Sequence, residues 1–142
     1  MPQDRAKSKE LLLKVGELGC AQAYHNLGNA YQNGSGVELD MKKAFYYYEL
    51  AAMNGSVNAR HNLGGIEYNS GNKVRAMKHF IMAAKAGLKF SLDMIKYGYE
   101  KGYVTKDEYA NTRRAYQQQQ EETTSDERNK AAILYPLVAG SR

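Results

Sequence analysis

The chain repeats itself along its length, and this repeat constrains the fold more than any other feature of the sequence. The segment AYHNLG at residues 23–28 returns as ARHNLG at residues 59–64, an offset of 36 residues. A second pattern, made of alanines, one aromatic residue and a glycine, occupies residues 44–55. It is repeated in residues 76–87, at an offset of 32 residues. Such a period is typical of a solenoid, whose stacked units present a surface rather than a catalytic cleft. The sequence therefore favours a binding protein over an enzyme.

Composition indicates the cellular compartment and limits the number of repeats. The 142 residues provide for one compact domain or three to four repeats, and only two of them are proline. The single cysteine, Cys20, cannot form an internal disulfide, which indicates a reducing compartment. Residues 1–16 are charged, and their longest apolar stretch is three leucines, so they do not resemble a signal peptide or a membrane span. We expect a cytoplasmic or nuclear protein with no membrane segment.

Turn and capping residues divide the chain into helices. Glycine, asparagine and serine interrupt it at 19, 33–36, 54–55, 70–71 and 102. The helices predicted from these breaks and the capping residues are 4–18, 22–32, 41–53, 58–69, 72–86 and 89–100. Capping boxes at 105–108 and 124–127 predict a helix to about residue 121 and then a last short helix that Pro136 ends.

One stretch carries a recognisable repeat pattern. More than a dozen spaced positions agree with it: Gly34-x-Gly36-Val37-x-x-Asp40-x-x-Lys43-Ala44-x-x-Tyr47-Tyr48-x-x-Ala51-Ala52-x-x-Gly55-x-x-x-Ala59-x-x-x-Leu63-Gly64. This resembles the Sel-one-like repeat, a relative of the tetratricopeptide repeat. The family often has Trp at Tyr47 and Lys at Leu50, and the second copy here lacks the Gly-x-Gly loop. The cysteines of the family's disulfide-bearing branch are missing. The resemblance implies an α/α superhelix that serves as an adaptor or scaffold.

We therefore predict an all-α, right-handed superhelical solenoid of about three helix–turn–helix repeats, similar to tetratricopeptide arrays. The expected units are a half-repeat 4–20, a repeat 21–58, a repeat 59–90 and a degenerate terminal repeat 91–121, together forming an array over 1–121. Residues 122–142 are expected to be a short capping helix and a frayed tail. Tyr48 and Phe80 share one register and should be buried between helix pairs.

Enzymatic sites are not favoured. Gly34-x-Gly36 lacks the third glycine of a dinucleotide fingerprint and follows a helix, so it reads as a turn. His25, His61 and His79 have no repeating cysteine or carboxylate beside them to complete a zinc site. We expect no catalytic residue, metal or cofactor; a hydrolase stays open only because some members of the resembled family have been described as enzymes.

A basic stripe is the basis of an alternative function. Arg75, Lys78, Lys85 and Lys89 recur on one side of the helix at 72–86, in a chain of net charge +5. The stripe could bind nucleic acid or an acidic partner. It lacks the interleaved aromatic side chains that stack on bases, so nucleic acid is the weaker hypothesis.

The predicted binding site is the concave groove that the first helix of each repeat would line. Amides and imidazoles there can hydrogen-bond to the backbone of an extended peptide. A protein or peptide partner of unknown identity is therefore expected, with Tyr46 and Tyr47 on the opposite face as the other possible contact surface. The candidate groove residues are Gln22, His25, Asn29, Gln32, Asn58, His61, Tyr68, Asp93 and Tyr97.

Overall fold

The computed structural model describes residues 20–140, and side chains are described as far as residue 133. Within this range all regular structure is α-helical, which confirms the predicted fold class. The predicted helix over 4–18 lies outside the described residues. The helices are α2 (Ala21–Asn33), α3 (Met41–Met53), α4 (Val57–Asn69), α5 (Lys73–Lys85), α6 (Lys89–Lys101) and α7 (Lys106–Gly140).

The helix ends lie at the capping residues of the sequence. The Asp40 carboxylate accepts hydrogen bonds of 3.1 Å from two backbone N–H groups in the first turn of α3. Ser56 caps α4 by accepting a hydrogen bond of 3.1 Å from the N–H of Ala59. Helices α2 and α6 end at Gly34 and Gly102, whose φ angles of 68° and 83° suit glycine. Local chemistry thus determines the lengths of the helices.

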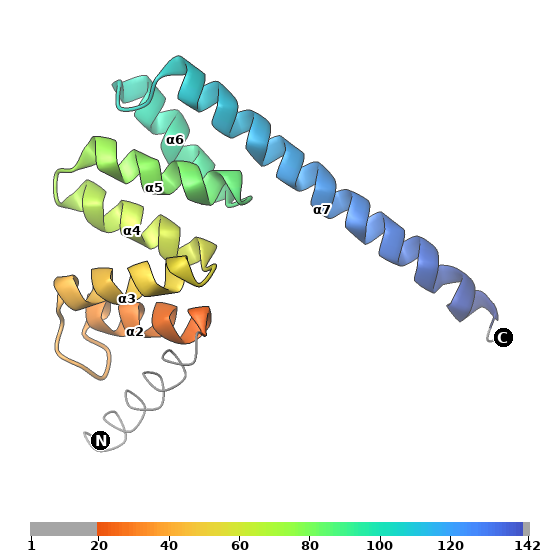
Figure 1. Cartoon of the computed structure of the whole chain (residues 1–142), viewed down its shortest axis with the longest axis horizontal. Helices are drawn as coiled ribbons and strands as arrows, with labels where there is room; N and C mark the ends of the chain where they lie inside the picture. Colours follow the sequence, from red (N-terminus) through yellow and green to blue (C-terminus); the bar gives the residue numbers. More distant parts are fainter. Residues whose placement is uncertain (1–19, 141–142) are drawn as a thin grey trace.

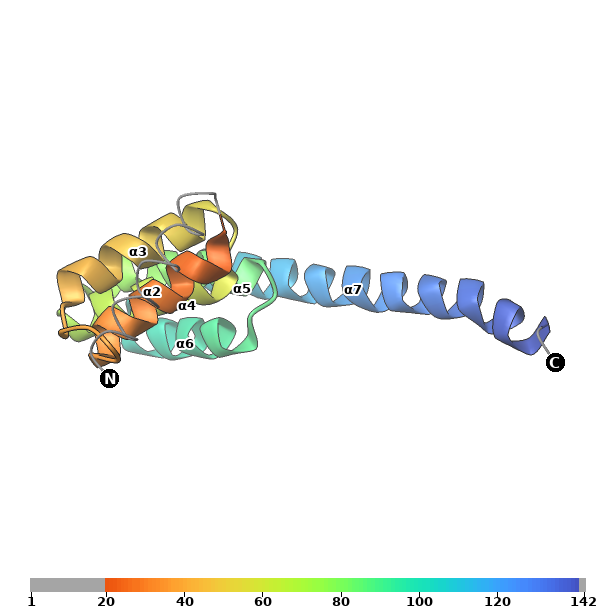
Figure 2. The same cartoon turned by 90° about the horizontal axis from the view of Figure 1, so that it is seen from below.

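The helices form hairpins that stack into a solenoid. Helices α2 and α3 make the first hairpin, α4 and α5 the second, and α6 with the start of α7 the third. Figure 1 shows α2 to α6 stacked one over another, while α7 leaves the stack and projects from it; Figure 2 shows the same projection from a second side. The array therefore has a compact part and an extended arm.

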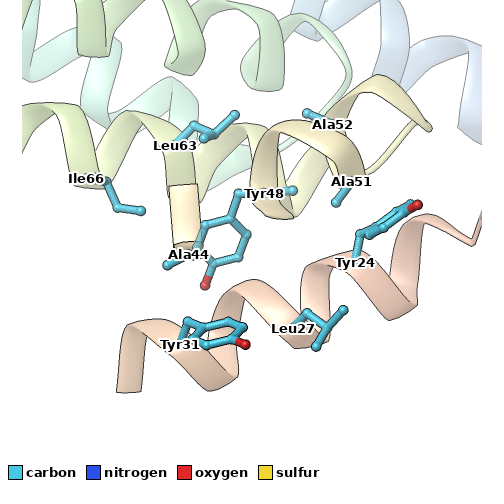
Figure 3. Close-up of a cluster of buried hydrophobic side chains, with 10 residues drawn as sticks. Tyr24, Leu27, Tyr31, Ala44, Tyr48, Ala51, Ala52, Leu63 and Ile66 are labelled. Atoms are coloured by element: carbon cyan, nitrogen blue, oxygen red, sulfur yellow. The ribbon is translucent and has the colours of Figure 1, made fainter. Parts of the chain in front are cut away.

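Glycines in the first helix of two hairpins allow the second helix to approach closely. The ring of Tyr48 covers Gly28, where an added Cβ would lie 2.5 Å from Tyr48 Cδ1. The ring of Phe80 covers Gly64 in the same way, at 2.6 Å from Phe80 Cε1. Both rings are buried, as predicted, and Figure 3 shows Tyr48 pointing from α3 towards α2. Each glycine and its ring form the centre of a hairpin.

The third hairpin departs from this pattern. Helices α2, α4 and α6 have 13 residues each, and the place of Gly28 and Gly64 is taken in α6 by Lys96. The close approach moves along the helix to Gly98, where an added Cβ would lie 2.5 Å from Met77 Sδ of α5. Helix α6 is therefore packed tightly against the preceding hairpin. Its contact with α7, its partner in the third hairpin, lacks the glycine–ring centre of the other two hairpins.

The predicted break near residue 122 is wrong. The first capping box forms as expected, with the Thr105 N–H donating to Glu108 Oε1 at 3.0 Å and the Glu108 N–H donating to Thr105 Oγ1 at 3.1 Å. At the second box, however, the Thr124 hydroxyl donates to the carbonyl of Gln120 one turn earlier. A threonine bonded in this way sits inside a helix rather than capping one. Helix α7 thus runs unbroken for 35 residues, with Pro136 inside it.

Candidate functional site

The first helices of the three hairpins, α2, α4 and α6, form one layer, which we call the first-helix layer. Side chains join neighbouring helices within it: Asn62 Nδ2 lies 3.1 Å from His25 Nε2, and His61 Nδ1 lies 2.8 Å from Ser91 Oγ. Because the three helices are equal in length, positions can be compared directly between them. His25, His61 and Asp93 occupy the same position and form a row across the layer.

The candidate groove residues all belong to this layer, but they differ in accessibility. Four of them are exposed, namely Gln22, Asn58, Asp93 and Tyr97. The other five are partly buried, namely His25, Asn29, Gln32, His61 and Tyr68. Most of these five residues already form hydrogen bonds within the chain. They therefore stabilise the fold and are also partly accessible to a ligand.

The Tyr48 hydroxyl is the main internal partner of the candidate amides. It lies 2.5 Å from Asn29 Oδ1 and 2.6 Å from Gln32 Oε1. Burial raises the pKa of Tyr48 to about 12, so the hydroxyl stays protonated near neutral pH. The amides of Asn29 and Gln32 therefore help hold α3 against α2, which leaves fewer of their polar atoms for a ligand than we expected.

The second hairpin lacks the hydroxyl and both amides of this group. Phe80 replaces Tyr48 there, and with the hydroxyl gone the two amides are gone as well: Gly65 stands at the position of Asn29 and Tyr68 at that of Gln32. A buried hydroxyl needs partners, and an aromatic ring without one does not. The chain thus loses all three polar groups together.

The two groove histidines pack on the rings of the hairpin centres. The His25 ring lies 5.7 Å from that of Tyr48, and the His61 ring lies 5.0 Å from that of Phe80. Burial lowers the pKa of both histidines. His25 Nδ1 is buried and has no hydrogen-bond partner among the described residues. Both rings are neutral near pH 7, and they act as packing and hydrogen-bonding groups.

Helix α6 has an exposed aromatic surface, of which Tyr97 was predicted from the sequence and Phe90 was missed. Phe90 stands at the position of Gln22 and Asn58 and is 71% exposed. Tyr97 lies two turns further along α6, is 40% exposed, and its ring is 6.5 Å from that of Tyr68. Extending the register by 32 residues from Asn58 would have identified Phe90. The layer is thus rich in amides at α2 and in aromatic rings at α6.

Two of the four cations of the basic stripe lie within ion-pair distance of a carboxylate. Arg75 lies 3.7 Å from the carboxylate of Glu67, a buried residue that also accepts a hydrogen bond of 2.9 Å from Asn72. Lys89 belongs to α6, where it pairs with Asp93 at 3.7 Å. Exposed ion pairs stabilise weakly. Lys78 and Lys85 on α5 are therefore the exposed cations of the stripe that form no ion pair within the described part of the chain.

The side chains of the first-helix layer are of kinds that can bind another molecule. No three His, Cys, Asp or Glu side chains in the described ranges come together as they would around a metal ion. No helix in the same ranges is long and apolar enough to cross a membrane. What the first-helix layer can do is form hydrogen bonds through amides and imidazoles and bury apolar groups against aromatic rings.

Comparisons with known proteins agree with the hairpin pattern. A family model described as Sel1 repeat matches residues 21–56 and again residues 57–88, which span α2 to α5. A Sel1-like repeat-containing protein of Acanthamoeba polyphaga mimivirus is 34% identical over 77 residues, which is 54% of this chain and 14% of the viral protein.

Two solved structures resemble the fold. A protective antigen of uropathogenic Escherichia coli strains, which displays an SLR fold, has a TM-score of 0.63 at 31% identity and covers 80% of this chain. A Sel1 repeat protein of Oxalobacter formigenes has a TM-score of 0.61 at 24% identity and covers 78%. The chain spans 25% and 48% of those two proteins, respectively. Residues 21–88 of this chain are thus two consecutive Sel1 repeats, and the chain shares its fold with Sel1-repeat proteins.

Proposed function

We propose that the chain is a protein-interaction module that binds an extended protein segment along the first-helix layer. Sel1 repeats generally mediate contacts between proteins, and solenoids bind extended partners on their concave surface. The proposal places that surface on α2, α4 and α6. An adaptor of this kind needs no catalytic residue, cofactor or metal.

The observation that carries the proposal is the exposed aromatic pair at α6. Phe90 and Tyr97 are seven residues apart, so they lie on one side of the helix about 10 Å from each other. Large exposed aromatic residues are enriched where proteins bind one another, since they bury much area at little entropic cost. They would receive apolar side chains of the partner.

The rest of the layer would bind the partner's backbone. Gln22 and Asn58 are exposed amides at the same position of α2 and α4. A side-chain amide can donate to a carbonyl and accept from an N–H group, so it bonds to a peptide backbone whatever the sequence. The segment would thus be anchored at α6 and aligned by amides across α4 and α2.

The test is the affinity of Phe90→Ala/Tyr97→Ala for a partner recovered by an unbiased pull-down. We expect binding at least about tenfold weaker, since anchoring aromatic residues commonly dominate an interface. The matched control is Tyr46→Ala/Val74→Ala, which truncates two exposed apolar residues of α3 and α5. Unchanged affinity in the first variant and a loss in the control would move the interface to the α3–α5 side.

A second candidate, nucleic-acid binding through the basic stripe, has less support. Two of its four cations are within ion-pair distance of carboxylates. Salt-sensitive binding of RNA or DNA that Lys78→Gln/Lys85→Gln abolishes would favour this candidate.

A further inference from the structure

The third hairpin contains a cleft between its two helices. Lys96 stands where Gly28 and Gly64 receive a ring, and its side chain is exposed. A residue with a Cβ cannot accept a ring at the distance seen in the other hairpins. The cleft between α6 and α7 has a volume of about 530 Å³. This volume is in the range of ligand sites, about 300 to 1,000 Å³.

The walls of the cleft are positively charged and aromatic. Lys89, Lys96 and Arg113 line it, together with one acidic side chain, Asp93. Lys89 lies 3.7 Å from Asp93, so these two charges largely offset each other. Lys96 and Arg113 have no ion pair within the described residues. The cleft therefore keeps two uncommitted cations.

Two tyrosines of α7 lie beside these cations. Tyr109 is four residues before Arg113 and Tyr116 is three residues after it, so each lies about one helical turn from Arg113 on the same wall of the cleft. The Arg113 guanidinium lies 5.4 Å from the centre of the Tyr109 ring. An aromatic face holds the guanidinium in place without neutralising it. The rings also supply apolar area for the carbon chain of a ligand.

We propose that this cleft binds a short acidic peptide segment, with its carboxylates at Lys96 and Arg113 and its chain against Tyr109 and Tyr116. A peptide fits the cleft better than a nucleic-acid backbone, because Asp93 can accept a hydrogen bond from a backbone N–H group and a sugar–phosphate backbone has no such donor. The cleft shares helix α6 with the surface proposed above, but Lys96, Arg113, Tyr109 and Tyr116 are not among the residues that bind the partner there. Either proposal can therefore fail without the other.

The experiment measures fluorescence anisotropy of a labelled octapeptide of alternating glutamate and alanine with the full chain at low ionic strength. Lys96→Gln/Arg113→Gln should weaken binding at least about tenfold, because both charge-assisted contacts are lost. The control Lys78→Gln/Lys85→Gln removes the same charge from α5 and should leave the affinity within about twofold. Asp93→Asn should tighten binding, because it removes the repulsion.

Several results would overturn the proposal. These are no binding of the octapeptide at low ionic strength, equal binding of an octapeptide with glutamine in place of glutamate, and equal losses in the two double variants. Tighter binding of oligothymidylate through Lys96 and Arg113 would also do so, by assigning the cleft to nucleic acid. Circular dichroism of each variant verifies folding, and Lys96→Arg/Arg113→Lys should keep the affinity if charge is what binds.

Discussion

At the scale of single residues, the contact between a glycine and a ring determines how closely two helices approach. Gly64 lies under Phe80, and its neighbour Gly65 has nothing within 4 Å of an added Cβ. Both are glycines of the same helix, yet only one is needed for packing. The pair therefore separates the effect of packing from the general effect of glycine in a helix.

We expect Gly64→Ala to destabilise the protein by about 1 to 3 kcal/mol, because the Phe80 ring must move out of its place. Gly65→Ala should be neutral or should stabilise by up to about 1 kcal/mol, because alanine favours the helix and meets no atom. Urea unfolding followed by circular dichroism measures both. Equal effects of the two substitutions would contradict the packing shown here.

Histidines make stability depend on pH. Burial lowers the pKa of His25, His61 and His79 below the ordinary 6.5. All three are neutral in both states well above pH 6.5, so their contribution to stability is complete there. As the pH falls below 6.5 the unfolded chain takes up protons first, and stability is lost until the folded pKa values are passed.

The free energy of unfolding should therefore decrease between about pH 7.5 and 5. His61→Gln should make this decrease smaller, because glutamine can still bond to Ser91 and does not titrate in this range. Urea titrations at a series of pH values give the slope. A stability that rises on acidification would show that these histidines are not buried as described.

At the scale of elements, α7 consists of two parts with different surroundings. Its first half packs on the array, and Gln120 Nε2 donates to the Gly87 carbonyl at 3.3 Å. From residue 121 to residue 133 every side chain is exposed, including Ile133 at 66%. A lone helix in water is marginal, because most helical stability comes from packing. The projecting half thus adds little to the stability of the array.

Truncation after Gln120 should therefore leave the melting temperature nearly unchanged. Truncation after Thr105 should lower it clearly, since it also removes Thr112, which is fully buried, and the Tyr109 ring that stacks on Tyr99 at 5.1 Å. Thermal unfolding of both shortened chains is the measurement. A large loss from the first truncation would mean that the projecting half packs on the array.

At the scale of the whole molecule, the stack brings together groups that are far apart in the sequence. Phe45 and His79 meet across the second helices with ring centres 6.5 Å apart, while the histidine and amide bonds join the first helices. Each hairpin contacts its neighbours in the stack, as in other solenoids. The first-helix layer is therefore a surface that no single repeat possesses.

Local residue patterns specify the architecture of this protein, because each repeat carries its own capping and packing residues. Asp40 and Ser56 begin helices, Gly34 and Gly102 end them, and the recurring small and large residues specify which faces meet. These are local effects that recur at a constant offset, so the number of helices from α2 to α6 and their bounds follow within a residue or two. The buried places of Tyr48 and Phe80 follow in the same way.

Which polar groups are free, and whether α7 breaks near residue 122, depend on contacts that no local pattern of residues specifies. Asn29, Gln32 and His61 read as groove residues, but their hydrogen-bond partners come from other helices that no local pattern identifies. Thr124 could cap a new helix or bond within an old one, and the second applies in α7. The cleft beside Lys96 likewise depends on how α7 packs against α6. Such features depend on which partner the fold brings near, which is a property of the assembled stack.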